Sequence, residues 1–94
     1  MTPKPGDLCV WWIPQVPMKA FHIPVKNIDE AKLVLKVLGN YDIFQLDNNI
    51  KPDYSNAGGL NVYTLDIDGE GTPGWEEWHN DEGDDIDEVM EDEP

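Results

Sequence analysis

The chain of 94 residues contains no arginine, and all six of its positive charges are lysines. Against them stand twenty acidic residues, which give a formal net charge of −14 at pH 7. Proteins bind nucleic acid largely by neutralising phosphates with Lys and Arg, and anionic membranes repel acidic chains. We therefore expect no direct binding of nucleic acid or membrane, and instead attraction to basic surfaces.

The chain is also poor in cysteine and in long apolar runs. Cys9 is its single cysteine, so an intramolecular disulfide is excluded. The longest apolar run covers residues 8–13, whereas a membrane span needs about 20 residues. Residues 1–7 contain no apolar segment of the kind found in a signal peptide. These absences favour a cytoplasmic protein.

The charges are divided unevenly along the chain. Residues 1–51 hold five acids and six lysines, whereas residues 52–94 hold fifteen acids and no lysine. The stretch 48–60 separates the two parts and is rich in Asn and Gly. The sequence thus predicts a near-neutral scaffold followed by an acidic half.

Five short segments have the composition of β-strands. Residues 8–13 are apolar, β-branched and aromatic, which predicts a strand covered on both faces. Residues 20–25 predict an edge strand because they contain a proline. Residues 41–46, 60–65 and 75–78 are further strand candidates, and the last two can form a hairpin across a Gly-rich turn.

One segment has the pattern of a helix. Asn27 is a suitable N-cap, Glu30 follows at the capping-box spacing, and Gly39 is a suitable C-terminal stop. The spacing predicts a helix over 28–38, with one apolar face formed by Ala31, Val34, Leu35 and Leu38.

This order of elements predicts an α+β fold, a small and mostly antiparallel sheet of four or five strands with one helix packed on it. We expect residues 1–79 to form a single domain and residues 80–94 to form an acidic, flexible tail. Within the tail, Ile86, Val89 and Met90 have the spacing of a short amphipathic helix that orders on a partner, although a solvated tail explains the same residues.

The residues that usually carry chemistry are scattered. Cys9, His22 and His79 lack the paired short spacings of a zinc site. Ser55 has no neighbouring histidine, and no phosphate-binding glycine loop is present. We expect no catalytic residues, no metal and no cofactor, and thus a protein that is not an enzyme.

Residues 66–77 resemble a calcium loop in part. Asp66, Asp68, Glu70, Gly71 and Glu77 occupy positions 1, 3, 5, 6 and 12 of an EF-hand-like loop. The segment before the loop has the pattern of a strand rather than a helix, and the same acids suit a soluble hairpin tip. Calcium binding is therefore the third hypothesis for function.

The central stretch offers a different site. Its side chains can hydrogen-bond many partners, and tryptophan supplies a stacking surface. The second hypothesis is therefore a module that sequesters a small molecule or a nucleotide signal through Trp11, Asn49, Lys51, Asp53, Tyr54 and Asn56. A structural crossover explains the same loop without a ligand.

Three segments together resemble a group of small acidic proteins of bacteriophages and prophages. They are residues 11–17 (WWIPQVP), 41–45 (YDIFQ) and 49–60 (NIKPDYSNAGGL), and the resemblance extends over roughly residues 10–88, including the acidic, Trp-containing 75–87. The resemblance brings no established activity and no functional residues, but it implies a phage-encoded accessory protein that acts in the bacterial cytoplasm. Such proteins often bind and inhibit a host enzyme or a defence system.

The leading hypothesis combines this resemblance with the charge. Carboxylates spaced along a strand and tail can stand in for phosphates, so we expect a bacterial partner with a basic, nucleic-acid-binding surface, as in DNA mimicry. The expected partner-binding residues are Asp66, Asp68, Glu70, Glu76, Glu77, Trp78, Asp84, Asp85, Asp87 and Glu88.

Overall fold

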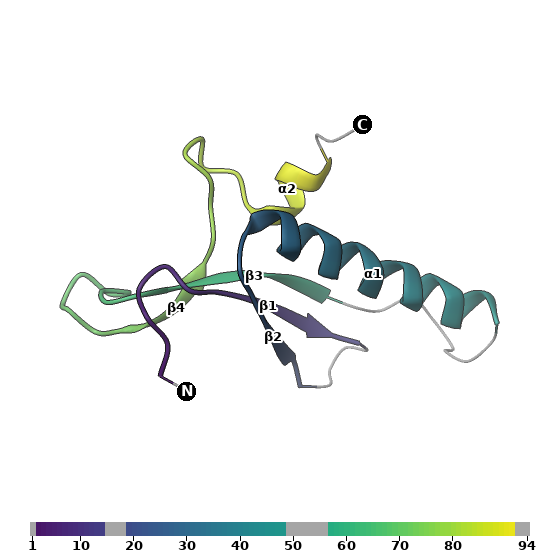
Figure 1. The fold of residues 1–94 in the computed structure, drawn as a ribbon, viewed down its shortest axis with the longest axis horizontal. Helices are drawn as coiled ribbons and strands as arrows, with labels where there is room; N and C mark the ends of the chain where they lie inside the picture. Colours follow the sequence, from purple (N-terminus) through teal and green to yellow (C-terminus); the bar gives the residue numbers. More distant parts are fainter. Residues whose placement is uncertain (1, 15–18, 49–56, 92–94) are drawn as a thin grey trace.

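A computed structural model describes residues 2–14, 19–48 and 57–91, and these residues form a small α+β fold (Figure 1). A four-stranded antiparallel sheet is one layer of the described part, and the long helix α1 lies along one of its faces, as predicted. The elements in chain order are β1 (Leu8–Ile13), β2 (Phe21–Val25), α1 (Ile28–Asp47), β3 (Ala57–Thr64), β4 (Gly74–Glu77) and α2 (Ile86–Glu91).

The sheet has the strand order β2-β1-β3-β4, so the most apolar strand lies inside it. Val10 stands opposite Ile23 on one side and Leu60 on the other. Because side chains alternate along a strand, Trp12 points towards α1 and Trp11 points to the open face. The predicted strands at 8–13, 20–25, 60–65 and 75–78 are confirmed within three residues at each end.

The core lies between the sheet and the helices. Its buried members come from β1, β2, α1, β3 and α2, namely Val10, Trp12, Val25, Ala31, Leu35, Leu60 and Ile86. Cys9 is also buried, but it lies on the sheet face away from this cluster, where burial raises the pKa of its thiol. A core of this size stabilises a chain of 94 residues only modestly, so single core positions matter.

Helix α1 begins at Ile28 after the N-cap Asn27, as the sequence predicts. The Asn27 side-chain oxygen accepts a hydrogen bond from the backbone N–H of Glu30 at 2.8 Å. In return, the Glu30 carboxylate accepts from the backbone N–H of Lys26 at 3.2 Å. These two bonds satisfy N–H groups that have no partner within the helix.

The end of α1 is not the predicted one. The helix continues through Gly39 to Asp47, and Asn48 caps it by donating from its backbone and side-chain nitrogens to the Phe44 carbonyl. The predicted strand at 41–46 is therefore wrong. Asp42 lies seven residues after Leu35 and is buried on the same face of the helix. Because this position is polar, the apolar periodicity that predicts a helix is interrupted there.

Two glycines of β3 make room for the paired tryptophans of β1. Gly58 lies opposite Trp12 and Gly59 lies opposite Trp11. A Cβ at Gly58 would stand 2.3 Å from Cε3 of Trp12, and a Cβ at Gly59 would stand 2.6 Å from Nε1 of Trp11. Each indole therefore lies directly against a glycine backbone, one on each face of the sheet.

This packing predicts the effect of Gly58→Ala. Trp12 is a core residue and must shift to admit the methyl group, which we expect to cost about 1–3 kcal/mol of unfolding free energy in a urea titration. Gly39→Ala is the matched control, because nothing lies within 4 Å of its Cβ position. It should stabilise the helix by up to about 1 kcal/mol. Equal effects of the two substitutions would contradict the proposed packing.

Candidate functional site

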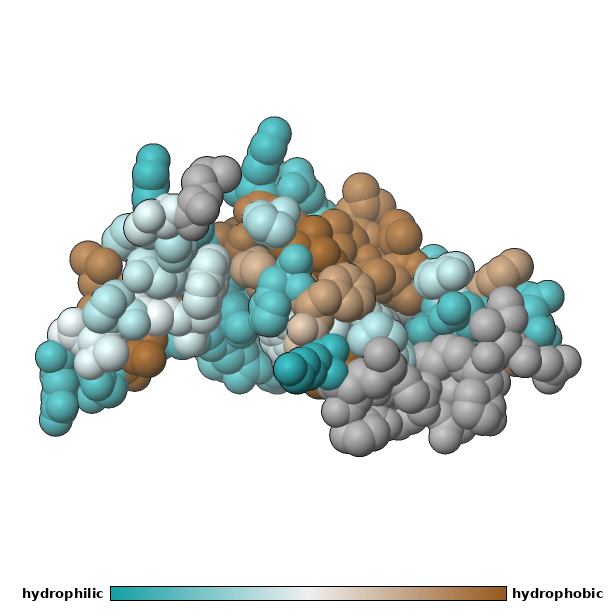
Figure 2. Space-filling model, turned by 90° about the horizontal axis from the view of Figure 1, so that it is seen from below, coloured by the Kyte–Doolittle hydropathy of each residue, from teal (hydrophilic) through white to brown (hydrophobic). Residues whose placement is uncertain are grey.

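The predicted partner-binding acids occupy two connected parts of the molecule, the β3–β4 hairpin and the segment that forms α2. The sequence prediction left out Asp81, Glu82 and Glu91, which lie on the same part of the chain. The acids of β4 lie on both faces of the sheet, because Glu76 and Glu77 are neighbours in one strand. We use the name acidic surface for the following twelve residues of the hairpin and the α2 segment together: Asp66, Asp68, Glu70, Glu76, Glu77, Asp81, Glu82, Asp84, Asp85, Asp87, Glu88 and Glu91. At the end of the molecule that carries the β3–β4 loop, Figure 2 shows hydrophilic residues mixed with pale and hydrophobic ones, and it shows a hydrophobic band in the middle of the molecule.

Two of these acids fold the β3–β4 loop. The Asp68 carboxylate accepts hydrogen bonds from the hydroxyl of Thr72 at 2.7 Å and from the backbone N–H of Glu70 at 2.9 Å. These bonds, with the Thr72 hydroxyl contributing most, hold the pKa of Asp68 below its ordinary value. Asp66 accepts from the backbone N–H of Gly71 at 2.9 Å, and Gly71 has a positive φ of 84°. Glu70, in contrast, exposes its side chain at the tip.

The structure of the hairpin loop and of the histidines can be compared with the calcium and zinc sites considered from the sequence. Among the described residues, no group of three or more His, Cys, Asp or Glu side chains is placed to hold a metal ion. The carboxylates of Asp66 and Asp68 instead accept hydrogen bonds from their own loop. His79 pairs with an acid of β4, its Nε2 lying 3.8 Å from Oε2 of Glu77.

Strand β4 presents its residues to both faces of the sheet. Trp75 stands opposite Tyr63, with ring centroids 5.4 Å apart in an edge-to-face arrangement. Glu76 lies on the other face, opposite Val62. Trp78, predicted as a partner contact, packs partly buried against the core, and its backbone N–H donates to the Leu60 carbonyl at 2.9 Å.

The connection from β4 to α2 is folded by local hydrogen bonds. The Asn80 side-chain oxygen accepts from the backbone N–H groups of Glu82 and Asp84, each at 2.9 Å. Asp85 and Glu88 then form a reciprocal capping box, with side chain to backbone distances of 2.9 and 3.3 Å. Four acids thus take part in a compact turn and helix start.

The predicted amphipathic helix over Ile86, Val89 and Met90 is present as α2. It packs on this chain's own core, because Ile86 is only 2% exposed and Met90 lies against the same cluster. The carboxylates of α2 are thereby held next to the hydrophobic body of the protein. The division of the chain at residue 79, with a flexible tail after it, stays a prediction.

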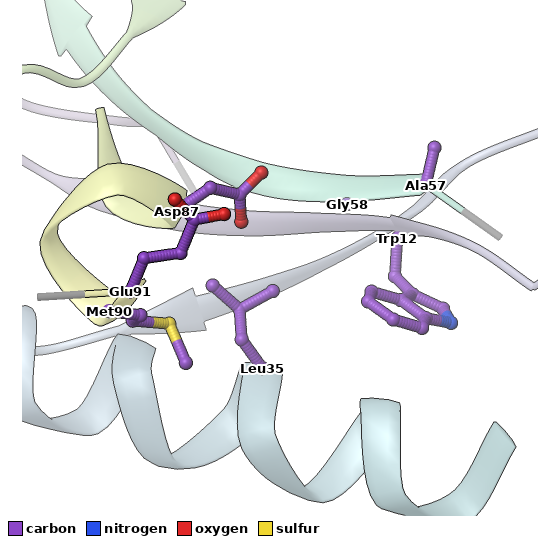
Figure 3. A pocket seen from close by; sticks show the side chains of 7 residues that line it. All are labelled: Trp12, Leu35, Ala57, Gly58, Asp87, Met90 and Glu91. Carbon is purple, nitrogen blue, oxygen red and sulfur yellow. The ribbon is translucent and has the colours of Figure 1, made fainter. Parts of the chain in front are cut away.

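A groove opens where α1, α2 and β3 meet (Figure 3). Trp12 and Leu35 point into it from β1 and α1, while Asp87, Met90 and Glu91 enter from α2. Its volume is about 510 Å³. The groove combines an apolar floor with two carboxylates, and the sequence did not predict it because its residues come from distant parts of the chain.

The charges around the groove repel one another. Partial burial, followed by the negative charges of Asp85, Glu91 and Glu77, raises the pKa of Asp87 above its ordinary value. The ionised Asp87 therefore costs folding stability, fully so above its raised folded-state pKa. The cost shrinks as the pH falls below that value, and it is gone below the ordinary pKa that the carboxyl has in the unfolded chain.

This shift predicts the behaviour of Asp87→Asn. At neutral pH the variant should melt higher than the parent by roughly 1–3 °C, a small gain because solvent screens a mostly exposed carboxyl. The gain should disappear at acidic pH, where the parent's carboxyl is also neutral. Asp81→Asn changes the net charge equally at an exposed turn position and serves as the control. A gain that persists at acidic pH would contradict this assignment.

The residues of the alternative ligand site are only partly described. Asn49, Lys51, Asp53, Tyr54 and Asn56 lie outside the described residues. Trp11 lies on the open face of the sheet, where a small hollow is lined by Trp11, Ala20, His22, Asn61 and Glu77. The structure thus places one of the six predicted residues beside a cavity.

No helix within the described residues is long and apolar enough to cross a membrane.

The fold and the acidic surface define a small, acidic α+β protein, and comparison with known proteins places it in a phage family. The family model described as "Superinfection exclusion gene product 17" matches residues 7–93, so the chain belongs to this family. A superinfection exclusion protein of Salmonella phage P22 is 54% identical over 56 residues, which are 60% of this chain and 54% of that protein. The chain thus spans about half the length of this curated relative, and no solved structure matches it.

These findings confirm the phage origin that the sequence resemblance implied. They also correct it in one respect, because the family is described by superinfection exclusion, whereas the resemblance supplied no established activity.

Proposed function

We propose that this protein takes part in superinfection exclusion by binding a basic surface of a bacterial host or defence protein and thereby blocking nucleic acid from that surface. The observation that carries the proposal is the segregation of charge. Fifteen of the twenty acids follow residue 51 with no lysine among them. In the fold, twelve of these acids lie on the hairpin and the α2 segment.

The acids of this surface divide into two kinds. Asp66, Asp68, Asp85 and Glu88 accept hydrogen bonds that shape the loop and the helix start. Glu70 and Glu76 have exposed side chains and no such structural bond. The first kind fixes the backbone, and the second kind is available to pair with Lys or Arg of a partner.

The groove beside α2 gives this surface a specific feature. A Lys or Arg side chain has an apolar stem and a charged head. Trp12, Leu35 and Met90 offer contact to such a stem, and Asp87 and Glu91 offer charge to its head. A bound cation would also offset the burial and the neighbouring negative charges that together raise the pKa of Asp87. The groove therefore supports a partner that inserts one basic side chain.

Capture from host lysate tests the proposal. The immobilised full chain should retain basic proteins at low salt and release them at about 0.5 M salt, because screening weakens exposed charge pairs. The double variant Glu70→Gln/Glu76→Gln should retain roughly tenfold less of these proteins. Its matched control, Asp29→Asn/Asp47→Asn, removes two exposed acids from α1 and should bind like the parent. The proposal fails if no basic protein is retained at low salt, or if the two variants lose binding equally.

A second candidate function is binding of a small molecule or nucleotide signal on the open sheet face. Trp11 and Trp75 lie on this face, and cavities between them are lined by His22 and Asn61. Stacking on tryptophan depends little on salt. Ligand binding that quenches tryptophan fluorescence and persists at high salt would therefore favour this candidate over the first.

A further inference from the structure

Helix α1 carries a second apolar face that points away from the core. Its buried face is formed by Ala31, Leu35 and Leu38 with Asp42, whereas Leu33, Val37 and Phe44 lie on the opposite side. Tyr41 lies between the two sides, because it follows Val34, which packs against the core, by seven residues. Successive members of this second face are four, four and three residues apart, so they form one stripe along the helix. We use the name outer stripe for Leu33, Val37, Tyr41 and Phe44, which are 57–61% exposed.

The outer stripe contrasts with an ordinary surface helix. The outward face of such a helix is polar, and a helix that is apolar on both faces is covered on both. Figure 1 shows α1 reaching beyond the sheet at its C-terminal half, where Phe44 lies. A continuous line of exposed large apolar residues marks an interaction surface.

We infer that the outer stripe is the contact between two copies of this chain, which pair through antiparallel α1 helices. The first argument is the spacing. Leu33 and Phe44 are symmetric about the midpoint between residues 38 and 39, so an antiparallel pair brings Leu33 of one copy opposite Phe44 of the other. Val37 and Tyr41 are symmetric about residue 39, so in the same arrangement they face each other to within one residue of register. A twofold axis brings the same surface together from both copies, so the stripe must be self-complementary, as this spacing is.

The second argument is charge. Residues 1–51, which include α1, carry six lysines against five acids, whereas the acidic surface lies on the hairpin and α2. Contact through α1 therefore joins the near-neutral parts of the two copies. A strongly basic partner would instead be drawn to the acidic surface. The stripe and the acidic surface thus suit different occupants, and this inference does not depend on the proposed function.

The expected dimer is weak. Specific stable interfaces bury about 800 Å² on each partner, which is more than four partly exposed side chains supply. We expect a dissociation constant on the order of 10 µM to 100 µM. Raising the salt concentration should tighten the dimer, since each copy carries a net charge of −14. Binding of a basic partner has the opposite salt dependence.

Sedimentation equilibrium of the full chain tests the inference. The apparent mass should rise with concentration from the monomer value of 10.7 kDa towards twice that value. Phe44→Ser should weaken association at least tenfold while the far-ultraviolet circular dichroism stays unchanged. Leu65→Ser is the matched control, because Leu65 is equally exposed, at 58%, but lies beyond β3. Monomers at every concentration, or equal loss in both variants, would overturn the inference.

Disulfide trapping tests the antiparallel register. A mixture of Leu33→Cys and Phe44→Cys chains should form a mixed disulfide dimer on mild oxidation. Leu33→Cys alone should not, because its two copies would lie about 16 Å apart along the antiparallel helices, too far for a disulfide. The natural Cys9 is buried, and the unaltered chain reports any background. Equal trapping by Leu33→Cys alone would overturn the antiparallel arrangement.

Discussion

Ile86→Ala is expected to remove about 2–4 kcal/mol of unfolding free energy and to lower the melting temperature by roughly 10–20 °C. Ile86 is 2% exposed and is the residue of α2 that enters the core. Helix α2 has six residues, which is too short to be stable in water by itself. Loss of the Ile86 contact should therefore release α2 from α1 and β3.

Thermal unfolding followed by circular dichroism and tryptophan fluorescence measures this effect. Val89→Ala is the matched control, because Val89 lies on the same helix but is only partly buried. It should cost less than about 1 kcal/mol. If the two alanine variants melt alike, α2 is not held by Ile86 in the way described.

Reversing the charge of Glu70 and Glu76, whose carboxylates make no structural hydrogen bond, should have the largest effect on binding of the partner protein. Once a host protein has been captured, Glu70→Lys/Glu76→Lys should weaken its affinity on the order of 100-fold at low salt, because like charges then face each other. Both residues are exposed and have no structural hydrogen bond, so the fold should tolerate the change. Isothermal titration calorimetry with the purified partner measures the affinity.

The control for this prediction changes the charge equally elsewhere. Asp29→Lys/Asp47→Lys alters two exposed acids of α1 by the same amount. Its affinity should fall less than about threefold, reflecting only the change in net charge. A comparable loss in both variants would show that net charge, and not the acidic surface, governs binding.

The fold was largely predictable because its strands and its first helical turn carry local signals. The apolar, β-branched and aromatic composition of residues 8–13 and the Asn27 cap are examples, and the strand and the cap are both confirmed. The second half of α1 was not predictable in this way. Gly39 suggests a stop, and buried Asp42 interrupts the apolar pattern, so tertiary packing extends the helix where local propensity ends it.

The candidate site was only partly predictable for a similar reason. The acids of residues 66–88 are visible in the sequence, but their division into structural and free carboxylates depends on loop hydrogen bonds. The groove joins Trp12 and Leu35 to Met90, which are far apart in the chain. The outer stripe was not predictable from the sequence, because Tyr41 and Phe44 lie in the part of α1 that follows the predicted helix end.

The docking of α2 connects stability with the proposed function. Asp87 and Glu91 take their positions from a helix that Ile86 holds in place. Ile86→Ala should therefore weaken partner binding without changing the net charge. The acidic hairpin should retain part of the affinity, because its loop is folded by its own hydrogen bonds.

The central claim is that the acidic surface occupies the nucleic-acid-binding surface of a host protein. Competition between this phage protein and fluorescent duplex DNA for the captured partner tests it most directly. We predict that the parent chain displaces the DNA completely, that Glu70→Lys/Glu76→Lys does so only at far higher concentration, and that Asp29→Lys/Asp47→Lys behaves like the parent. A ternary complex, in which the partner holds the DNA and the phage protein together at saturation, would contradict the account.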